Sequence, residues 1–481
     1  MKKVIFFIIF YSLSMQMHAQ QFQFNSKDLK GTIKILTSDS LKGRETGTIG
    51  QQKTAKFISD KFKSFGLSPF VNKSFLEPYN IICSYWSNVY IKYKNKQFNN
   101  FQDIIYIGAK IENNELKKKI VFGGNGSIDQ LCKIDVKGKI VVVFTNNLRT
   151  YNIINNDVKR KGAYGLILTN PSNSNQFRSI AKTSKQNFLK KYYFLLSNSH
   201  NKKLLPFIDS LKPIKTWYLT NSSVKNIFGT SINNLLVAMH NNRIESIPNS
   251  TVTIRCEKVL DTLYSSNVCG FIKGKTNKSI IITAHYDHLG SIGRRFFPGA
   301  DDNASGTAAL IALAKEFAND RNLNYNLVFL ATSGEEEGLL GSEFFANTTL
   351  PNTENILCNI NMDMISRNDS LHSYKENYLY SIGTDRSEYL KSILIKAENT
   401  FKECKFDFSL DNTFDSLGIY TRADQYSFSS KGIPSILFFS GLHNDYHKVS
   451  DTKEKINFSV YEKRVQLIAT VIKLLENELL E

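Results

Sequence analysis

Cysteine, tryptophan and histidine are scarce in this chain of 481 residues, which has 6 Cys, 2 Trp and 8 His. No two cysteines form a CxxC pair, so the thiolate pairs typical of zinc ribbons and redox motifs are not indicated. A chain of this length needs no disulfide to form a core. Cys256 and Cys269 flank a segment that we expect to be a hairpin, and the sequence leaves open whether they form a bridge.

Long apolar runs are also missing after the first residues. The chain begins MKKVIFFIIFYSLSMQMHAQQ, in which two lysines precede an apolar run from Val4 to Leu13 and small residues follow around Ala19. This pattern predicts a secretory signal peptide over residues 1–19. The run is short for a membrane span of about 20 residues, although an N-terminal anchor is the alternative. We therefore expect export to the periplasm or outside the cell, with no membrane contact after the signal is removed.

Acidic residues are fewer than basic ones, and the formal net charge is +18. A basic protein can bind nucleic acid, but no RNP, zinc-finger or helix-turn-helix pattern occurs. The lysines are scattered along the chain, so we interpret the charge as compositional and expect no nucleic-acid partner. The oligomeric state is not indicated.

The hydrophobic pattern divides the mature chain into three parts. Residues 20–80 contain helical patterns, one of which places Ala55, Ile58 and Phe62 on a single face. Residues 81–250 contain runs such as KGKIVVVFTN and predict an inserted, mostly β module without obvious chemistry. Residues 251–481 alternate strands with helices, which predicts an α/β fold with a mixed, mostly parallel sheet and helices on both faces.

Polar residues collect where the predicted strands of this last part end. Ligands of open α/β sheets bind at the carboxyl ends of strands, so we expect these side chains to meet. Carboxylates and imidazoles without cysteine suit zinc and similar divalent ions. The residues concerned are His285, Asp287, Asp301, Asp302, Glu335, Glu336, Glu337, Asp363, His443, Asp445 and His447.

The number of these groups is sufficient for two metal ions about 3.5–4 Å apart. We predict that Asp301 bridges the two ions and that Asp302 faces elsewhere. His285 would bind metal with Asp287 orienting its ring, and one of Glu335 and Glu336 would bind metal while the other acts as general base. The pattern does not decide between these glutamates, or between His443 and His447. His288 is interpreted as an ordinary loop histidine.

Six sequence blocks together resemble the co-catalytic zinc aminopeptidases of metallopeptidase family 28. The blocks are TAHYDHLG, PGADDNASGTAAL, TSGEEEGLLGSEFF, NMDMISR, GIPSILFFSG and HNDYHKVSDT. The stretch VKGKIVVVFTN with RKGAYGLILTN resembles a protease-associated domain, which some members carry as an insert. The likeness is strong after residue 265 and loose between residues 80 and 250.

The resemblance implies two zinc ions per chain and assigns the roles that the pattern left open. His285 and Asp363 would bind one zinc, Glu336 and His447 the other, with Asp301 as the bridge. Glu335 would be the general base and Asp287 the residue that orients His285. Two departures stand out: Gln425 replaces a histidine of many members, and HKVSD replaces an HTPSD-like stretch. No HExxH motif occurs, so single-zinc chemistry on a helix is not indicated.

The expected function is therefore an exported aminopeptidase that removes N-terminal residues from peptides. Three alternatives stay open: a zinc carboxypeptidase, a glutaminyl-cyclase-like enzyme on the same scaffold, and a non-catalytic ectodomain. Loss of ligands would mark the last of these, and every predicted ligand position is retained.

Overall fold

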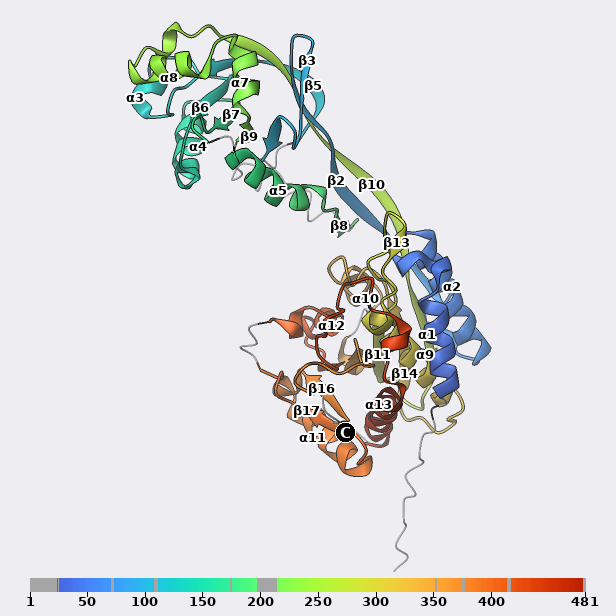
Figure 1. Ribbon diagram of the computed structural model, residues 1–481. Helices are drawn as coiled ribbons and strands as arrows, with labels where there is room; N and C mark the ends of the chain where they lie inside the picture. The colour runs from blue at the N-terminus through green and yellow to red at the C-terminus, as the bar shows by residue number, and fades with distance from the viewer. Residues whose placement is uncertain are drawn as a thin grey trace, which may run out of the picture. The chain divides into compact units, whose positions relative to one another are not determined.

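The computed structural model describes residues 24, 26–70, 73–107, 111–173, 175–196, 214–350, 353–372, 377–412 and 417–478 (Figure 1). The chain forms two compact units, one of residues Met1–Tyr79 with Tyr264–Glu481 and the other of Asn80–Leu263. The predicted signal peptide, residues 1–19, lies outside the described residues. The insert ends at Leu263 rather than at residue 250, because β10 (Ser250–Ile272) is one continuous strand that has residues in both units.

The first unit contains a mixed sheet whose centre is parallel. Strand β11 pairs in parallel with β14 and β15, and β15 pairs in parallel with β18. The antiparallel pairings lie outside this centre, where β16 meets β18 and β10 meets β14. In order, the sheet runs β17 (Lys405–Asp407), β16 (Tyr378–Ile382), β18 (Ser435–Phe439), β15 (Ile356–Met362), β11 (Ser279–His285), β14 (Asn326–Thr332) and β10, with β1 (Ser68–Pro69) on β10.

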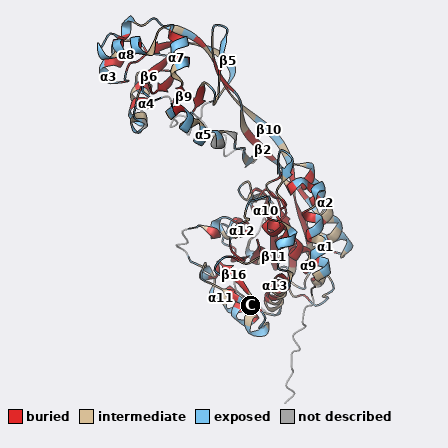
Figure 2. Ribbon diagram, viewed as in Figure 1, coloured by how far each residue is buried: buried red, intermediate tan, exposed pale blue. Residues whose placement is uncertain are grey.

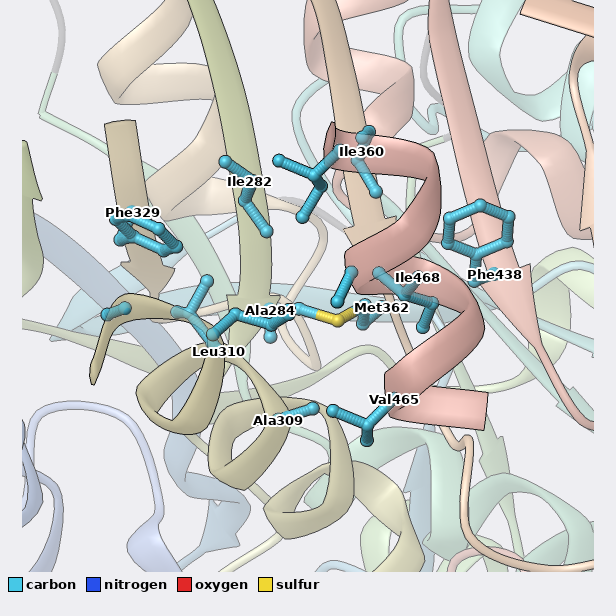
Figure 3. Close-up of a cluster of buried hydrophobic side chains, with 14 of the residues drawn as sticks. Ile282, Ala284, Ala309, Leu310, Phe329, Ile360, Met362, Phe438, Val465 and Ile468 are labelled. Atoms are coloured by element: carbon cyan, nitrogen blue, oxygen red, sulfur yellow. The ribbon is translucent and has the colours of Figure 1, made fainter. Parts of the chain in front are cut away.

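Both faces of this sheet are buried, as all seven residues of β11 show (Figure 2). Successive side chains of a strand point to opposite faces. Ile280 and Ile282 accordingly belong to the large core on one face, and Ile281 belongs to a smaller core on the other. Figure 3 shows the larger core, in which Ile282 and Met362 of the strands lie beside Leu310 and Ile468 of two helices.

Helices cover both faces, as the sequence pattern predicts. On one face α9 (Gly306–Phe317) packs against β11 and β14, and α1 (Ser26–Leu36), α2 (Ile49–Ser64) and α13 (Phe458–Asn477) pack against α9. On the other face α12 (Gln425–Ser429) packs against β15, β18 and α10 (Leu340–Thr348). The helix α11 (Glu388–Thr400) contacts α13. Such cover explains why the central strands are nearly continuous apolar runs.

The second unit differs from the mostly β module that the sequence predicts. Its strands β5 (Glu112–Phe122), β6 (Ile140–Phe144), β7 (Gly165–Thr169) and β9 (Lys215–Leu219) are parallel neighbours. The helices α4 (Tyr151–Arg160), α5 (Asn175–Leu189), α7 (Asn221–Phe228) and α8 (Ile232–His240) accompany them. Polar residues dilute the apolar pattern of these helices, especially α5, and sequence reasoning therefore missed most of them. The unit has two cores of its own.

Cys256 and Cys269, whose pairing the sequence left open, do not form a bridge. Both thiols are free and buried. Both residues lie on β10, which is one continuous strand where we expected a hairpin. A strand rises about 3.3 Å per residue, so the two sulfur atoms are far beyond bonding distance.

Within the described residues, no helix has the length and apolar character needed to cross a membrane.

Candidate metal centre

The carboxyl ends of four parallel strands carry the polar residues that the sequence singled out. β11 ends at His285 and β15 is followed at once by Asp363. The loop after β14 carries Glu335 and Glu336, and the loop after β18 carries His447. Because parallel strands end at one edge, residues that are far apart in the sequence form one cluster.

Asp302 lies at the centre of this cluster. Its carboxylate completes two groups of potential ligand atoms, one with His285 and Asp363 and the other with His288 and Glu336. Within each group all ligand atoms lie within 4.8 Å of one another. A carboxylate shared by two such groups has the position required of a bridge between two cations.

The prediction that Asp301 is the shared carboxylate is therefore wrong. Asp301 Oδ1 accepts hydrogen bonds from the backbone N–H and the hydroxyl of Ser366, at 2.8 and 2.7 Å. Its Oδ2 lies 3.2 Å from His443 Nε2. The two aspartates are adjacent, and the irregular backbone between Gly299 and α9 turns their side chains to different sides.

His285 and Asp363 form the first group as predicted. His285 Nε2 lies 3.3 Å from Asp363 Oδ1 and 3.5 Å from Asp302 Oδ1. The other ring nitrogen, Nδ1, lies 3.2 Å from the carbonyl oxygen of Asp287 and 3.7 Å from its Oδ1. Asp287 thus stands beside His285, and both its carbonyl and its carboxylate face that nitrogen.

Glu336 and His288 form the second group with Asp302, and His447 lies within contact distance of both carboxylates. His447 Nε2 lies 3.1 Å from Glu336 Oε2 and 3.2 Å from Asp302 Oδ2. His288, which we expected to be an ordinary loop histidine, is 1 % exposed. Its Nδ1 lies 2.6 Å from Glu336 Oε1. The sequence signal that could have identified His288 is its spacing of three residues from His285.

Glu335 lies beside both groups. Its Oε2 is 3.8 Å from His285 Nε2, and its backbone N–H donates to Asp287 Oδ1 at 3.4 Å. Burial raises the pKa of Glu335 well above its ordinary value, and the charges of Asp363 and Glu336 add to this while His285 opposes it. A buried carboxyl group with a raised pKa is suited to accepting and releasing a proton.

The surrounding charges indicate that the cluster suits cations. Burial raises the pKa of Asp363, and it raises the pKa of Asp287 to about 6. Burial opposes ionisation of Glu336 too, but the charges and hydrogen bonds of His288 and His447 hold its pKa well below the ordinary value. Buried carboxylates are stable only when they are paired or bind metal. Imidazole and carboxylate donors in two overlapping groups fit zinc.

Arg44 fixes the loops around the cluster, and sequence reasoning missed it. Its guanidinium group is buried and donates to the carbonyl oxygens of Leu36, Tyr286, Pro298 and Gly299. The last three belong to the segments that carry Asp287 and Asp302. Burial lowers the pKa of Arg44 to about 10, so the side chain stays charged near neutral pH.

Asp451 holds the backbone of the two aspartates from another side. Its Oδ2 accepts from the backbone N–H groups of Asp301 and Asp302, at 3.0 and 3.2 Å. This carboxylate belongs to the HKVSD stretch that departs from the resembled pattern. Through Asp451, the stretch therefore holds the backbone that carries Asp302.

Three other residues that the sequence analysis considered lie away from the cluster. His443 faces Asp301. Asp445 binds Arg367 at 2.9 Å and Lys455 at 2.7 Å. Gln425 is buried, where its amide nitrogen donates to the carbonyl oxygen of Tyr420 at 2.6 Å. Gln425 therefore serves the packing of α12 in this structure.

A pocket opens beside the cluster. Carboxylates of the cluster form part of its lining, and apolar side chains form another part. Arg422 and Tyr446 also line it, with the Arg422 guanidinium group donating to the Tyr446 hydroxyl at 3.2 Å. The apolar lining is Met364, Ile419, Ala423, Leu437, Phe439 and Leu442.

Comparison with known sequences matches residues 267–472 to Peptidase family M28. A probable leucine aminopeptidase of Arthroderma benhamiae is 24% identical over 224 residues, which cover 44% of this chain and 58% of the relative. Aminopeptidase YwaD of Bacillus subtilis is 27% identical over 226 residues, which cover 43% of this chain and 44% of that protein. The alignments thus span less than two thirds of these relatives.

Solved structures agree with the fold. A zinc aminopeptidase from Bacillus subtilis has a TM-score of 0.51 at 19% identity, over 94% of this chain and 95% of its own. An aminopeptidase from Aneurinibacillus sp. strain AM-1 has a TM-score of 0.50 at 18% identity, over 93% of each chain. These likenesses confirm the predicted mixed, mostly parallel α/β fold. Residues 267–472 of this chain are therefore similar in sequence to Peptidase family M28.

Proposed function

We propose that the chain is a zinc aminopeptidase that hydrolyses the first peptide bond of substrates with a free N-terminus. The observation that carries this proposal is the position of Asp302, shared by two donor groups beside a pocket with one apolar wall. His285, Asp302 and Asp363 would hold one zinc ion. Glu336, Asp302 and His447 would hold a second. Bound zinc supplies a Lewis acid for the scissile carbonyl and lowers the pKa of a water.

The chain's own residues then have separate tasks. Glu335 faces the pocket and takes the proton of the attacking water, which it later gives to the departing amine. Asp287 keeps the His285 ring oriented. The carboxylates at the pocket base attract the positively charged α-amine of the substrate, which restricts cleavage to the first residue. The apolar wall receives the side chain of that residue.

The lining of the pocket predicts which side chains are preferred. Met364, Leu437 and Phe439 offer no partner for a charged group, and burying an unpaired charge is costly. We therefore propose that leucine and methionine derivatives are cleaved faster than aspartate or lysine derivatives.

A panel of aminoacyl-p-nitroanilides tests the function directly. The purified protein is assayed with chelator, and again after zinc is restored, while bound zinc is counted by mass spectrometry. We expect activity on free-amine substrates, none on N-acetylated ones, loss with chelator and two zinc ions per chain. Absence of hydrolysis of every free-amine substrate by zinc-loaded protein contradicts the proposal. Cyclisation of N-terminal glutamine, or hydrolysis from the C-terminus, supports one of the alternatives.

Export also belongs to the proposal. The basic, then apolar, first residues support a signal peptide over residues 1–19. Expression of the full sequence in a Gram-negative host should release a mature chain that begins near residue 20. Recovery of the intact N-terminus in the cytoplasm contradicts it.

A further inference from the structure

His288 occupies a position that the proposed function does not use. The ring is buried, and its Nδ1 lies 2.6 Å from Glu336 Oε1. The other oxygen of Glu336, Oε2, lies 3.1 Å from His447 Nε2. A carboxylate that binds a cation is ionised and only accepts hydrogen bonds, so Nδ1 donates in this contact.

The ring is closely surrounded by other parts of the chain. A Cβ atom at Gly299 would lie 2.4 Å from Cδ2 of His288, and Gly299 has a positive φ of 55°. The ring of Phe297 meets that of His288 edge-on, with 6.4 Å between centroids. The backbone N–H of His288 donates to the carbonyl oxygen of Arg44 at 3.3 Å. A glycine is therefore required where the imidazole packs against the chain that leads to Asp302.

We infer that His288 is a positioning residue that fixes Glu336. Its Nδ1–H donates to Oε1, and Oε2 is then directed toward His447, on the side where the ion would bind. This inference rests on the proposed two-zinc site. Hydrogen-bond partners of this kind orient ligands, and their loss commonly weakens metal binding by about 10–100-fold.

Two amide variants separate positioning from packing. In His288→Asn the amide nitrogen takes the place of Nδ1, whereas in His288→Gln it takes the place of Nε2. Zinc affinity of each is measured by competition with a chromogenic chelator, and unfolding of the metal-free proteins is measured alongside. We expect His288→Gln to weaken one of two sites by about 10-fold or more, and His288→Asn to retain much of the affinity. The control is His240→Gln on an exposed helix of the second unit.

The outcomes are distinguishable from failure of the proposed function. If wild-type protein binds two zinc ions and both amide variants bind them equally well, His288 does not position Glu336. Equal loss in both variants, with equal loss of stability in the metal-free state, shows a packing role only and also overturns the inference. Failure of the wild-type protein to bind zinc contradicts the proposed function instead.

The distribution of charge supports a second, independent inference. Residues 80–263 contain 27 Lys and Arg but only 10 Asp and Glu, whereas the other unit has 34 and 33. Almost all of the net charge of +18 therefore belongs to the inserted unit. The charge is thus distributed unevenly between the units, which a uniform compositional bias does not explain.

Helix α5 lies in a long segment of the inserted unit that has no acidic residue. Residues 158–208 contain no Asp or Glu. On α5, Arg178, Lys182 and Lys185 are exposed at spacings of four and three, so they share one face of the helix. The opposite face carries Phe177, which is buried, and Ile180, which packs against the same core. The basic face is thus fixed in orientation by the apolar one.

We propose that this α5 face binds acidic segments of polypeptides. The argument rests on the proposed function, because peptides are the partners that an aminopeptidase must meet. A surface of one sign concentrates partners of the opposite sign, and the attraction falls with ionic strength.

Binding is tested with an N-acetylated, glutamate-rich fluorescent peptide, which a free-amine exopeptidase does not cleave. Fluorescence anisotropy should show binding that weakens from 20 to 200 mM salt, and a glutamine-rich version of the peptide should not bind. The triple variant R178Q/K182Q/K185Q should lose at least about 5-fold in affinity. The matched control K56Q/K391Q/K431Q, in the other unit, should bind as the wild type does.

Equal loss in both triple variants overturns the proposal, since the effect is then one of total charge. Tighter binding of duplex DNA or of phosphatidylglycerol vesicles than of the acidic peptide overturns it in favour of another anionic partner. Turnover of leucine p-nitroanilide should be unchanged in R178Q/K182Q/K185Q, which separates this result from a failure of the catalytic site.

Discussion

Asp301 and Asp302 are neighbours in the sequence with different surroundings. Asp302 faces both donor groups, while Asp301 accepts from Ser366 and faces His443. Their backbone N–H groups share one acceptor, Asp451. Asp302 thus belongs to the proposed metal site, while Asp301 connects the same loop to Ser366 and His443. The two adjacent carboxylates therefore have different tasks.

The pair gives a direct test of the bridge. Asp302→Asn should weaken both zinc sites, because one shared oxygen donor is lost, and should reduce kcat/KM by at least about 1000-fold. Asp301→Asn should keep two zinc ions and lose stability, since a buried partner of Ser366 is changed. Zinc counting after dialysis and urea unfolding distinguish the two effects. The reverse pattern restores Asp301 as the bridge.

The proposed task of Glu335, proton transfer, can be tested separately from metal binding. Glu335→Gln keeps the shape of the side chain but cannot take a proton. We expect kcat to fall by about 100-fold or more, with two zinc ions still bound and KM little changed. Stopped-assay kinetics with leucine p-nitroanilide measure kcat and KM, and zinc counting measures the metal content. Near wild-type kcat would remove Glu335 as the base.

Residue-level sequence reasoning succeeded where the strand pattern decided the result. His285, Glu336, Asp363 and His447 follow predicted strands and reach the cluster. It failed for Asp301, because the direction of a side chain in an irregular loop depends on backbone angles that no periodicity encodes. It missed Arg44 for a similar reason, since the carbonyl groups that this side chain binds come from distant segments.

At the scale of elements, the loop between β18 and α13 combines two tasks. It presents His447 to the second donor group, and it places Asp451 under the backbone of Asp302. Arg367 stabilises the loop by an ion pair in which its Nη1 lies 2.9 Å from Asp445 Oδ2. Metal binding and the packing of the loop are thereby coupled through Asp302.

Asp451 predicts a pH dependence for the metal-free protein. Burial, with the charge of Asp301, raises its pKa from 3.8 to about 6. The folded state then holds more protons than the unfolded state between these values, so stability falls as pH rises through this window. Asp451→Asn keeps an acceptor oxygen and removes the ionisation. Relative to wild type, the variant should gain up to about 2 kcal/mol between pH 4.5 and 7.

Urea unfolding in the presence of chelator measures this difference at both pH values. The comparison between variant and wild type cancels the other groups that titrate in the same range. A difference that is equal at pH 4.5 and 7, or larger at pH 4.5, contradicts the assignment of the raised pKa to Asp451.

At the scale of the whole molecule, each unit has cores of its own. One contains the sheet, the metal site and its covering helices, and the other contains the parallel strands β5, β6, β7 and β9. The alternation of strands and helices predicted the first unit well, since buried parallel strands are readable as apolar runs. The sequence did not predict the helices of the second unit or the length of β10, because polar residues interrupt their apolar patterns.

Both tryptophans of the chain, Trp86 and Trp217, belong to the inserted unit. Trp217 is fully buried, so its fluorescence reports on the folding of that unit alone.

Zinc binds only the folded form of the other unit in our proposal, and a ligand stabilises only the unit that binds it. Removal of zinc should therefore lower the calorimetric transition of the catalytic unit by several degrees, while the midpoint of tryptophan fluorescence shifts by less than about 1 °C. The zinc-binding variant Asp302→Asn should reproduce the effect without chelator. Equal shifts of both signals would show that the two units unfold as one cooperative structure.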